Sequence, residues 1–196
     1  MLKTLLAAGS AAALIVSANA NPLTEAPAGA YEIDGNHAYI AFSYDHQGYS
    51  RPVLRVTKFD SSINLDPADP ANSTVVTTID VANIDSGVEV FDGHLQGENF
   101  FNAAAFPTIT FESTGIKITG DNTAKITGDL TIKGETKPVV LDAKFRKLGE
   151  TRDGRSKLGF GATTTIKRSD FGVDQYVPYV GDEVSITIET EYEQAK

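Results

Sequence analysis

Most of the chain follows the two-residue period of β-strands, in which every second side chain points to the same face of a sheet. The clearest case is residues 184–193, where Val, Ile, Thr and Tyr alternate with Ser, Thr and Glu. Residues 38–45 and 139–148 repeat the pattern, with Ile40 and Phe42 on the apolar face of the first of these segments. Such alternation is typical of antiparallel strands that bury one face and expose the other.

One stretch in the middle of the chain departs from this period. Between residues 88 and 104 β-branched residues are few, and Val88, Phe91 and Leu95 recur at roughly helical spacing. Pro107 ends the stretch, and a strand pattern resumes after it. We therefore predict a short helical insertion near residues 88–104 that covers one open end of a barrel. A plug that only completes the core fits the same pattern.

Turn signals rich in Gly, Asn, Asp and Pro separate the alternating segments, and the chain has no internal repeat. About eight short strands at regular spacing predict an all-β, antiparallel fold. A closed barrel is favoured over a sandwich because closure removes exposed sheet edges. A barrel of about eight strands is wide enough to hold one small ligand. The apolar faces of the strands either line such a cavity or fill a solid core.

The N-terminal residues have the pattern of a secretory signal peptide. Lys3 precedes an apolar run from Leu5 to Val16, and Ala18-Asn19-Ala20 forms an A-x-A cleavage site. The apolar run is shorter than a membrane span requires, so no integral membrane segment is expected after cleavage. We therefore expect a protein secreted to a bacterial periplasm, with three segments: a signal peptide at 1–20, a mobile leader at 21–29 and one domain at 30–196.

The charge and the absence of cysteine exclude several classes of function. The formal net charge is −9, and removal of Lys3 with the signal peptide makes it −10. An acidic chain without a basic cluster is not expected to bind nucleic acid. Because the chain has no Cys, thiol catalysis and thiolate metal sites are excluded.

The remaining candidates for catalysis and metal binding are few. The chain lacks the nucleophile-elbow, zinc-protease, P-loop and dinucleotide motifs. Its histidines, His37, His46 and His94, lie far apart in the sequence and are either surface residues or metal ligands brought together by the fold. We favour the surface interpretation and predict no metal. Asp92 and His94 form a possible acid–base pair, but no nucleophile accompanies them.

Short motifs occur together and in order along nearly the whole chain. They are Tyr31-x-Ile33-Asp34-x-x-His37, Ile84-Asp85-Ser86-Gly87, Phe91-Asp92-x-His94-Leu95, Phe106-Pro107-x-Ile109-x-Phe111, Gly128-Asp129-Leu130-Thr131-Ile132-Lys133-Gly134 and Arg168-Ser169-Asp170-Phe171-Gly172. The ordered set resembles the YceI family, bacterial periplasmic proteins with a lipocalin-like β-barrel that bind polyisoprenoid lipids. That family usually has Arg where this chain has Phe91, so the resemblance implies one polar contact fewer beside the insertion.

The apolar faces and the resemblance together predict non-catalytic binding, transport or storage of a long-chain isoprenoid, a quinone-like molecule or another amphiphilic lipid. No cofactor is expected besides such a bound lipid, and a homodimer is left open. An enzyme or accessory that acts on an isoprenoid quinone, and a packed β-barrel that serves only protein interaction, are the alternatives. The residues predicted to line the cavity are Ile40, Phe42, Tyr44, Val76, Ile79, Phe100, Phe101, Phe111, Ile126, Leu130, Phe145 and Ile186.

Polar residues predicted at the mouth of the cavity would orient the head group. These are His46, Asp92, His94, Arg168 and Asp170. Arg168 is suited to hold a phosphate or a carbonyl oxygen. We favour a structural role, in which Arg168 forms an ion pair with Asp92 or Asp170 and anchors its loop to the insertion.

Overall fold

The computed structural model describes residues 22–196, so the predicted signal peptide lies outside the described residues. Within this range, no helix has the length and apolar character that a membrane crossing would demand. The elements are η1 (Pro22–Glu25), β1 (Gly29–His46), β2 (Val53–Val56), β3 (Asp60–Leu65), η2 (Pro70–Asn72), β4 (Thr74–Asp80), η3 (Val81–Asn83), β5 (Ile84–Asp85), α1 (Glu89–Gln96), β6 (Thr108–Gly120), β7 (Thr123–Ile132), β8 (Glu135–Glu150), β9 (Ser156–Lys167), η4 (Arg168–Phe171) and β10 (Val180–Gln194).

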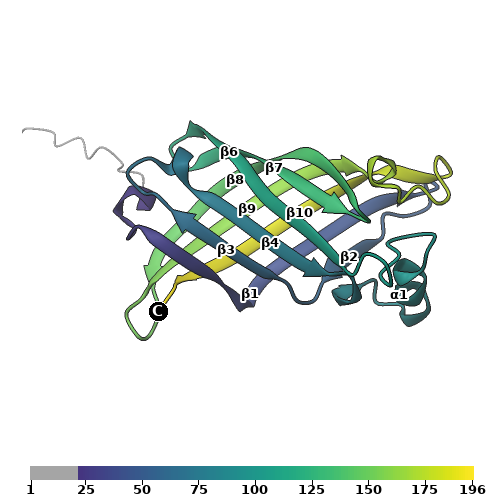
Figure 1. Cartoon of the computed structure of the whole chain (residues 1–196), viewed down its shortest axis with the longest axis horizontal. Helices are drawn as coiled ribbons and strands as arrows, with labels where there is room; N and C mark the ends of the chain where they lie inside the picture. The colour runs from purple at the N-terminus through teal and green to yellow at the C-terminus, as the bar shows by residue number, and fades with distance from the viewer. Residues whose placement is uncertain (1–21) are drawn as a thin grey trace, which may run out of the picture.

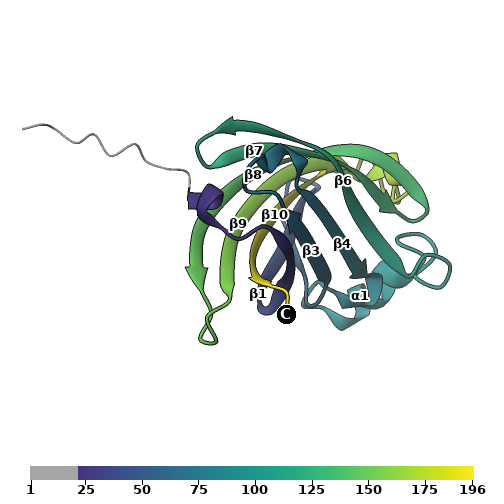
Figure 2. The same cartoon turned by 60° about the vertical axis from the view of Figure 1, so that its left-hand side comes forward.

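Eight of the strands form a closed antiparallel barrel (Figure 1, Figure 2). Around the wall the order is β1, β10, β9, β8, β7, β6, β4 and β3, and β3 pairs again with β1. The short strands β2 and β5 extend the wall, because β2 pairs with the second half of β1 and β5 pairs with β2. The prediction of an antiparallel barrel is confirmed.

β1 is one long strand with a wide bulge. The Gly35-Asn36 pair predicts a turn between two strands, but both residues lie inside β1. Ile33 pairs with Tyr192 and Ala38 pairs with Thr190, so the residues between Ile33 and Ala38 lie opposite Glu191 alone. A bulge bends its strand. Here the bend lets the first part of β1 pair with β3 and the second part with β2.

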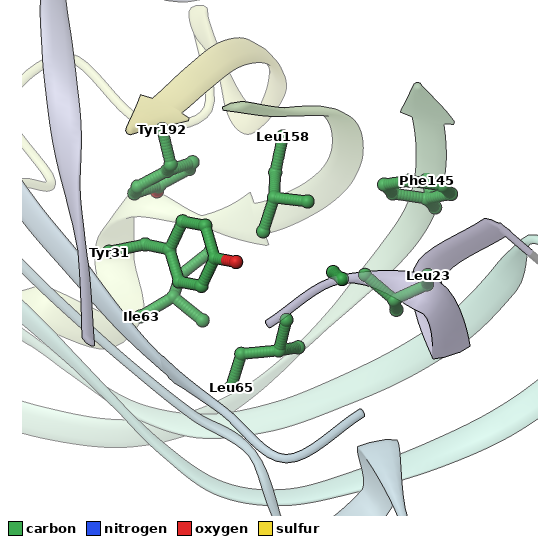
Figure 3. Close-up of a cluster of buried hydrophobic side chains, with 8 residues drawn as sticks. Leu23, Tyr31, Ile63, Leu65, Phe145, Leu158 and Tyr192 are labelled. Carbon is green, nitrogen blue, oxygen red and sulfur yellow. The ribbon is translucent and has the colours of Figure 1, made fainter. Parts of the chain in front are cut away.

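Residues 22–29 cover the end of the barrel that lies away from α1. Figure 3 shows Leu23 of η1 facing a group of buried side chains from β1, β3, β8, β9 and β10. The Tyr31 hydroxyl donates a hydrogen bond of 2.8 Å to the carbonyl oxygen of Pro27. Over its described residues, the segment predicted as a mobile leader packs on the barrel, because Leu23 and Ala26 are buried.

The insertion covers the opposite end of the barrel, as predicted. α1 is shorter than the predicted stretch, since it ends at Gln96 and turns follow as far as Pro107. The carboxylate of Asp92 lies in the first turn of the helix, where its negative charge interacts favourably with the positive end of the helix dipole. Leu95, Phe100 and Phe101 pack in a core cluster that also contains Phe171 of η4. The cluster joins the insertion to the connection between β9 and β10.

Candidate functional site

The barrel encloses a cavity of about 680 Å³. Its lining reaches from Leu23 and Leu65 at the η1 end to Val88 and Tyr176 at the α1 end. The volume falls within the range of roughly 300–1,000 Å³ that is usual for small-molecule sites. The alternative of a solid core, left open by the sequence, is therefore wrong.

The alternating faces predicted for β1, β8 and β10 point into this cavity. On β1 the lining residues are Ile40, Phe42 and Tyr44, and on β8 every second residue from Val139 to Phe145 contributes. Phe100 and Phe101 reach the cavity from the insertion. Eleven of the residues predicted for the cavity line it: Ile40, Phe42, Tyr44, Ile79, Phe100, Phe101, Phe111, Ile126, Leu130, Phe145 and Ile186.

Val76 is the predicted cavity residue that the structure contradicts. Its neighbours Val75 and Thr77 on β4 line the cavity together with Ile79, whereas Val76 is 43% exposed on the outer face. Two residues an odd number of positions apart point to opposite faces of a regular strand. Val76 and Ile79 therefore cannot both face inward. The sequence does not show which of Val75 and Val76 faces inward, because a valine fits either face of the strand.

A row of small side chains widens the cavity, and the prediction did not include it. Ala124 of β7 pairs with Ala143 of β8, and Ala143 pairs with Ala162 of β9. All three alanines line the cavity. Ala162 pairs in turn with Ile188 of β10. The register between strands brings these alanines together. In the sequence, each one is only an Ala on the apolar face of its own strand, so the row could not be predicted.

A small hydroxyl cluster interrupts the apolar lining. The Ser61 hydroxyl lies 2.8 Å from both the Thr77 hydroxyl and the Tyr192 hydroxyl. It also donates a hydrogen bond of 3.1 Å to the carbonyl oxygen of Val76. Burial raises the pKa of Tyr192, and hydrogen bonds to Ser61 and Thr190 oppose this shift. The cluster satisfies its own polar groups, so it adds polarity to the wall without demanding a polar ligand.

Arg168 lies at the α1 end of the cavity lining and holds its own loop by backbone contacts. Its Nε donates to the Gly181 carbonyl oxygen at 2.9 Å, and its Nη2 donates to that of Val180 at 3.0 Å. Its Nη1 donates to the carbonyl oxygens of Val173, at 2.6 Å, and Gln175, at 2.9 Å. Through these four hydrogen bonds the guanidinium holds the connection between η4 and β10 in place.

The electrostatics around Arg168 leave a positive charge beside the cavity. Burial lowers the pKa of Arg168, and the negative charge of Asp182 acts in the opposite direction. Burial raises the pKa of Tyr44, and the charge of Arg168 acts against that shift. Tyr44, His46 and Arg168 all belong to the cavity lining. These three polar residues therefore lie at the α1 end of an otherwise largely apolar lining.

The predicted ion pair of Arg168 with Asp92 or Asp170 is wrong. Among the residues that the structure describes, the partners of Arg168 are carbonyl oxygens, and no carboxylate lies within ion-pair distance. The Asp92 carboxylate instead accepts a hydrogen bond of 2.7 Å from the backbone N–H of Ser86. Anchoring of the loop, the role expected of the ion pair, is performed by backbone acceptors.

Three residues predicted at the mouth lie away from the cavity. Asp92, His94 and Asp170 are absent from its lining, and the last two are exposed. His94 sits on the outer side of α1, since Phe91 and Leu95 of the same helix face the cavity. Spacing on one short helix could not show which side faces inward. Of the five predicted mouth residues, His46 and Arg168 line the cavity.

The three histidines do not converge on a metal site in the described part of the chain. His37 lies beside Asp34 and Glu191, and their ligand atoms all fall within 4.8 Å of one another. The Lys157 amine already pairs with these carboxylates, at 2.8 Å from Asp34 and 2.7 Å from Glu191. A metal would have to displace this ammonium group.

Phe91 makes the wall beside the insertion apolar. Its ring lines the cavity and meets the ring of Phe100 edge-on, with ring centroids 6.3 Å apart. Phe100 also faces Tyr176, at a centroid distance of 6.4 Å. At this position, where the sequence resemblance implies an Arg, an aromatic contact holds the insertion together.

Comparison with known proteins agrees with this architecture. The YceI-like domain family matches residues 31–192. A UPF0312 protein of Azotobacter vinelandii is 38% identical over 195 residues, which cover 97% of this chain and 98% of the relative. The chain belongs to the YceI-like family. A second UPF0312 relative, from Ectopseudomonas mendocina, is 39% identical over 171 residues, which cover 85% of this chain and 88% of the relative.

Solved structures of other bacterial proteins share the barrel. Burkholderia cenocepacia BcnA superposes with a TM-score of 0.74 at 28% identity, over 81% of this chain and 98% of that one. The Campylobacter jejuni YceI protein gives a TM-score of 0.69 at 31% identity, over 75% of this chain and 87% of that one. A polyisoprenoid binding domain from Saccharophagus degradans, at 14% identity, has a TM-score of 0.68 over 85% of this chain and 99% of that one. The last likeness is one of fold.

Proposed function

We propose that this protein binds one long-chain isoprenoid or quinone-like lipid inside the barrel and transports or stores it in the periplasm, without chemical turnover. The observation that carries the proposal is the apolar cavity of about 680 Å³ between the two ends of the barrel. A ligand that matches this lining is long, apolar along most of its length and polar at one end. The shared fold of the polyisoprenoid binding domain from Saccharophagus degradans and membership of the YceI-like family support the same class of ligand.

The apolar tail should dominate the affinity. Burial of a methylene group contributes about 0.8 kcal/mol. A prenyl tail with about twenty buried carbons would therefore gain ~16 kcal/mol before the costs of ordering and association. One charge-assisted contact to the head group adds only about 1.5–3 kcal/mol. The tail sets the affinity, and the polar groups at the α1 end set the orientation.

The source of the lipid limits how tightly it is held. A tail that leaves a bilayer is already out of water, so most of the gain from burial is absent for that exchange. Net transfer then depends on small differences between cavity and bilayer. Such a balance suits a carrier that takes up and releases its ligand better than permanent sequestration.

The polar groups beside the cavity favour binding over catalysis. Asp92 and His94, the acid–base pair considered from the sequence, do not line the cavity. Arg168 donates its hydrogen bonds to backbone carbonyl oxygens. The Ser61 hydroxyl forms hydrogen bonds with the hydroxyls of Thr77 and Tyr192. Within the described residues, this leaves the lining without a nucleophile held by a general base.

Native mass spectrometry tests the proposal on protein purified from its own periplasm without detergent. A discrete mass excess that extracts into organic solvent as an isoprenoid would support it and would identify the ligand. An apo mass, together with no uptake of added prenyl lipid, would overturn it. Turnover of a bound quinone that disappears in His46→Ala would overturn the non-catalytic part and favour the enzyme alternative.

A further inference from the structure

Exposed apolar side chains gather at one end of the barrel. Six of the large exposed ones lie on segments at the α1 end, in the turn after β1, at the start of β2, around the start of α1 and in the connection before β10 (Figure 1). At the η1 end the corresponding residue is Ile118 of β6. We call the six residues the mouth rim: Tyr49, Val53, Val88, Val90, Tyr176 and Tyr179.

The mouth rim is continuous with the cavity wall. The turn between β1 and β2, the start of α1 and the connection before β10 each also contribute a side chain to the cavity lining, namely Pro52, Val88 and Tyr176. Beside these, Tyr49, Val90 and Tyr179 are exposed by 86%, 71% and 79% and do not line the cavity. Singly scattered apolar residues are ordinary on a protein surface, whereas a group around a cavity opening marks a site of interaction.

We infer that the mouth rim docks on the surface of an uncharged or zwitterionic lipid bilayer, from which the cavity is loaded. The inference rests on the proposed lipid-carrier function, since a lipid ligand is held in a bilayer before it is bound. Docking would place the cavity opening against the bilayer, so that the tail passes from one apolar environment to the other without crossing water.

The chemistry of the mouth rim fits this partner. Tyrosine gathers at membrane–water interfaces because its ring is apolar and its hydroxyl stays in contact with water. The mouth rim contains three tyrosines and three valines. The segments around it carry one exposed basic residue, Arg51, and two exposed acidic residues, Glu89 and Asp174. The formal net charge of −9 opposes an anionic surface. Docking should therefore weaken, and not strengthen, when anionic lipid replaces zwitterionic lipid.

Two sets of substitutions test the inference. The rim variant combines Tyr49→Ser, Val90→Thr and Tyr179→Ser, which leave the cavity lining unchanged. The control variant combines Tyr39→Ser, Val76→Thr and Val140→Thr, which remove exposed apolar side chains from the outer wall of the barrel. Each protein is measured in flotation with phosphatidylcholine vesicles, and in transfer of a prenyl lipid from those vesicles. Equilibrium binding of the same lipid added from solvent, without vesicles, is the third measurement.

The expected result separates the rim from the cavity. The rim variant should lose vesicle flotation and transfer lipid at least about tenfold more slowly, because less apolar area is buried at the bilayer. Its binding of lipid added from solvent should match the wild type, and the control variant should match the wild type throughout. Phosphatidylglycerol vesicles should retain less protein than phosphatidylcholine vesicles.

The contrary results differ for the two proposals. Equal transfer rates in wild type and rim variant would overturn docking and leave the carrier function intact. Failure of the wild type to bind lipid added from solvent would overturn the carrier function, whatever the vesicles do. A dimer of the wild type that the rim substitutions dissociate, seen by analytical ultracentrifugation, would make the mouth rim an interface between two copies and overturn docking on a bilayer.

Discussion

The side-chain amine of Lys133 lies 3.0 Å from the carbonyl oxygen of Glu98. The same amine lies 2.9 Å from the carbonyl oxygen of Gly172. Glu98 belongs to the insertion and Gly172 follows η4, so one side chain from the turn between β7 and β8 joins two segments that cover the α1 end of the barrel. These segments carry Phe100 and Phe171 of the cavity lining.

Lys133→Met should loosen this cover. Two hydrogen bonds from a partly exposed amine contribute about 1 kcal/mol to stability, so global unfolding should change little. Amide hydrogen exchange at residues 97–106 and 172–173 should become faster, because local opening no longer breaks these bonds. Hydrogen–deuterium exchange with mass spectrometry measures this. Lys137→Met in the same hairpin is the control, and unchanged exchange in both segments would contradict the role of Lys133.

The inward face of a strand could be predicted where alternation is strict. The prediction failed where β-branched residues occur on both faces. Ile186 lies in a run whose polar positions are Ser, Thr and Glu, so a single assignment of faces is possible. Val76 lies in Thr74-Val75-Val76-Thr77-Thr78, where either register buries a valine. A valine exposed on the outer face and a valine that lines the cavity then look alike in the sequence.

The contacts of loops and termini could not be predicted, for two physical reasons. Arg168 bonds to carbonyl oxygens, and every residue carries one, so side-chain types give no sign of such a partner. Leu23 lies in a segment rich in Pro and Ala, and its burial depends on the opening that the barrel leaves at that end. Both the hydrogen bonds of Arg168 and the burial of Leu23 depend on how the folded chain packs.

Arg168→Ala should lower stability more than lipid affinity. Loss of its bonds to four carbonyl oxygens between Val173 and Gly181 should cost about 2–4 kcal/mol. That corresponds to a fall in Tm of about 5–12 °C for a domain of this size. Affinity for a prenyl lipid should fall by less than about tenfold, since the tail dominates binding. Paired thermal melts and lipid titrations measure both quantities.

Lys167→Ala, an exposed neighbour at the end of β9, serves as the matched control for Arg168. It should leave both the Tm and the affinity near the wild-type values. A variant at Arg168 that melts like the wild type but binds lipid far more weakly would reverse the assignment, and Arg168 would then be a head-group ligand.

Asp34→Asn should make stability less dependent on pH in the acid range. Burial acts to raise the pKa of Asp34, but hydrogen bonds from Lys157, His37 and the Asn36 amide outweigh it and hold the pKa below the usual value. A carboxylate whose pKa is lower in the folded state stabilises that state above the unfolded pKa of about 4, and this contribution is lost as the pH falls further. The variant should therefore lose about 1–2 kcal/mol at pH 7 and less at lower pH.

Urea unfolding at a series of pH values between neutral and acid checks the contribution of Asp34. Asp129→Asn, an exposed carboxylate on β7, is the control and should follow the wild-type curve. A constant difference between Asp34→Asn and the wild type at every pH would show that the bulge gains nothing from the charge of Asp34.

Ala143→Phe tests the central claim, that the cavity holds the lipid tail. Ala143 lies between Ala124 and Ala162 in the row of alanines, so a phenyl ring there occupies the widened level of the cavity. Displacing about four methylene groups at ~0.8 kcal/mol each should lower prenyl-lipid affinity by roughly 100-fold. Val140→Phe adds the same ring to the same strand at a residue that is exposed on its outer face.

The decisive measurement is equilibrium binding of a prenyl lipid to wild type, Ala143→Phe and Val140→Phe, each first shown by thermal melting to be folded. The account predicts that Val140→Phe binds like the wild type and that Ala143→Phe binds roughly 100-fold more weakly. Wild-type affinity in Ala143→Phe would place the tail outside the barrel and contradict the account.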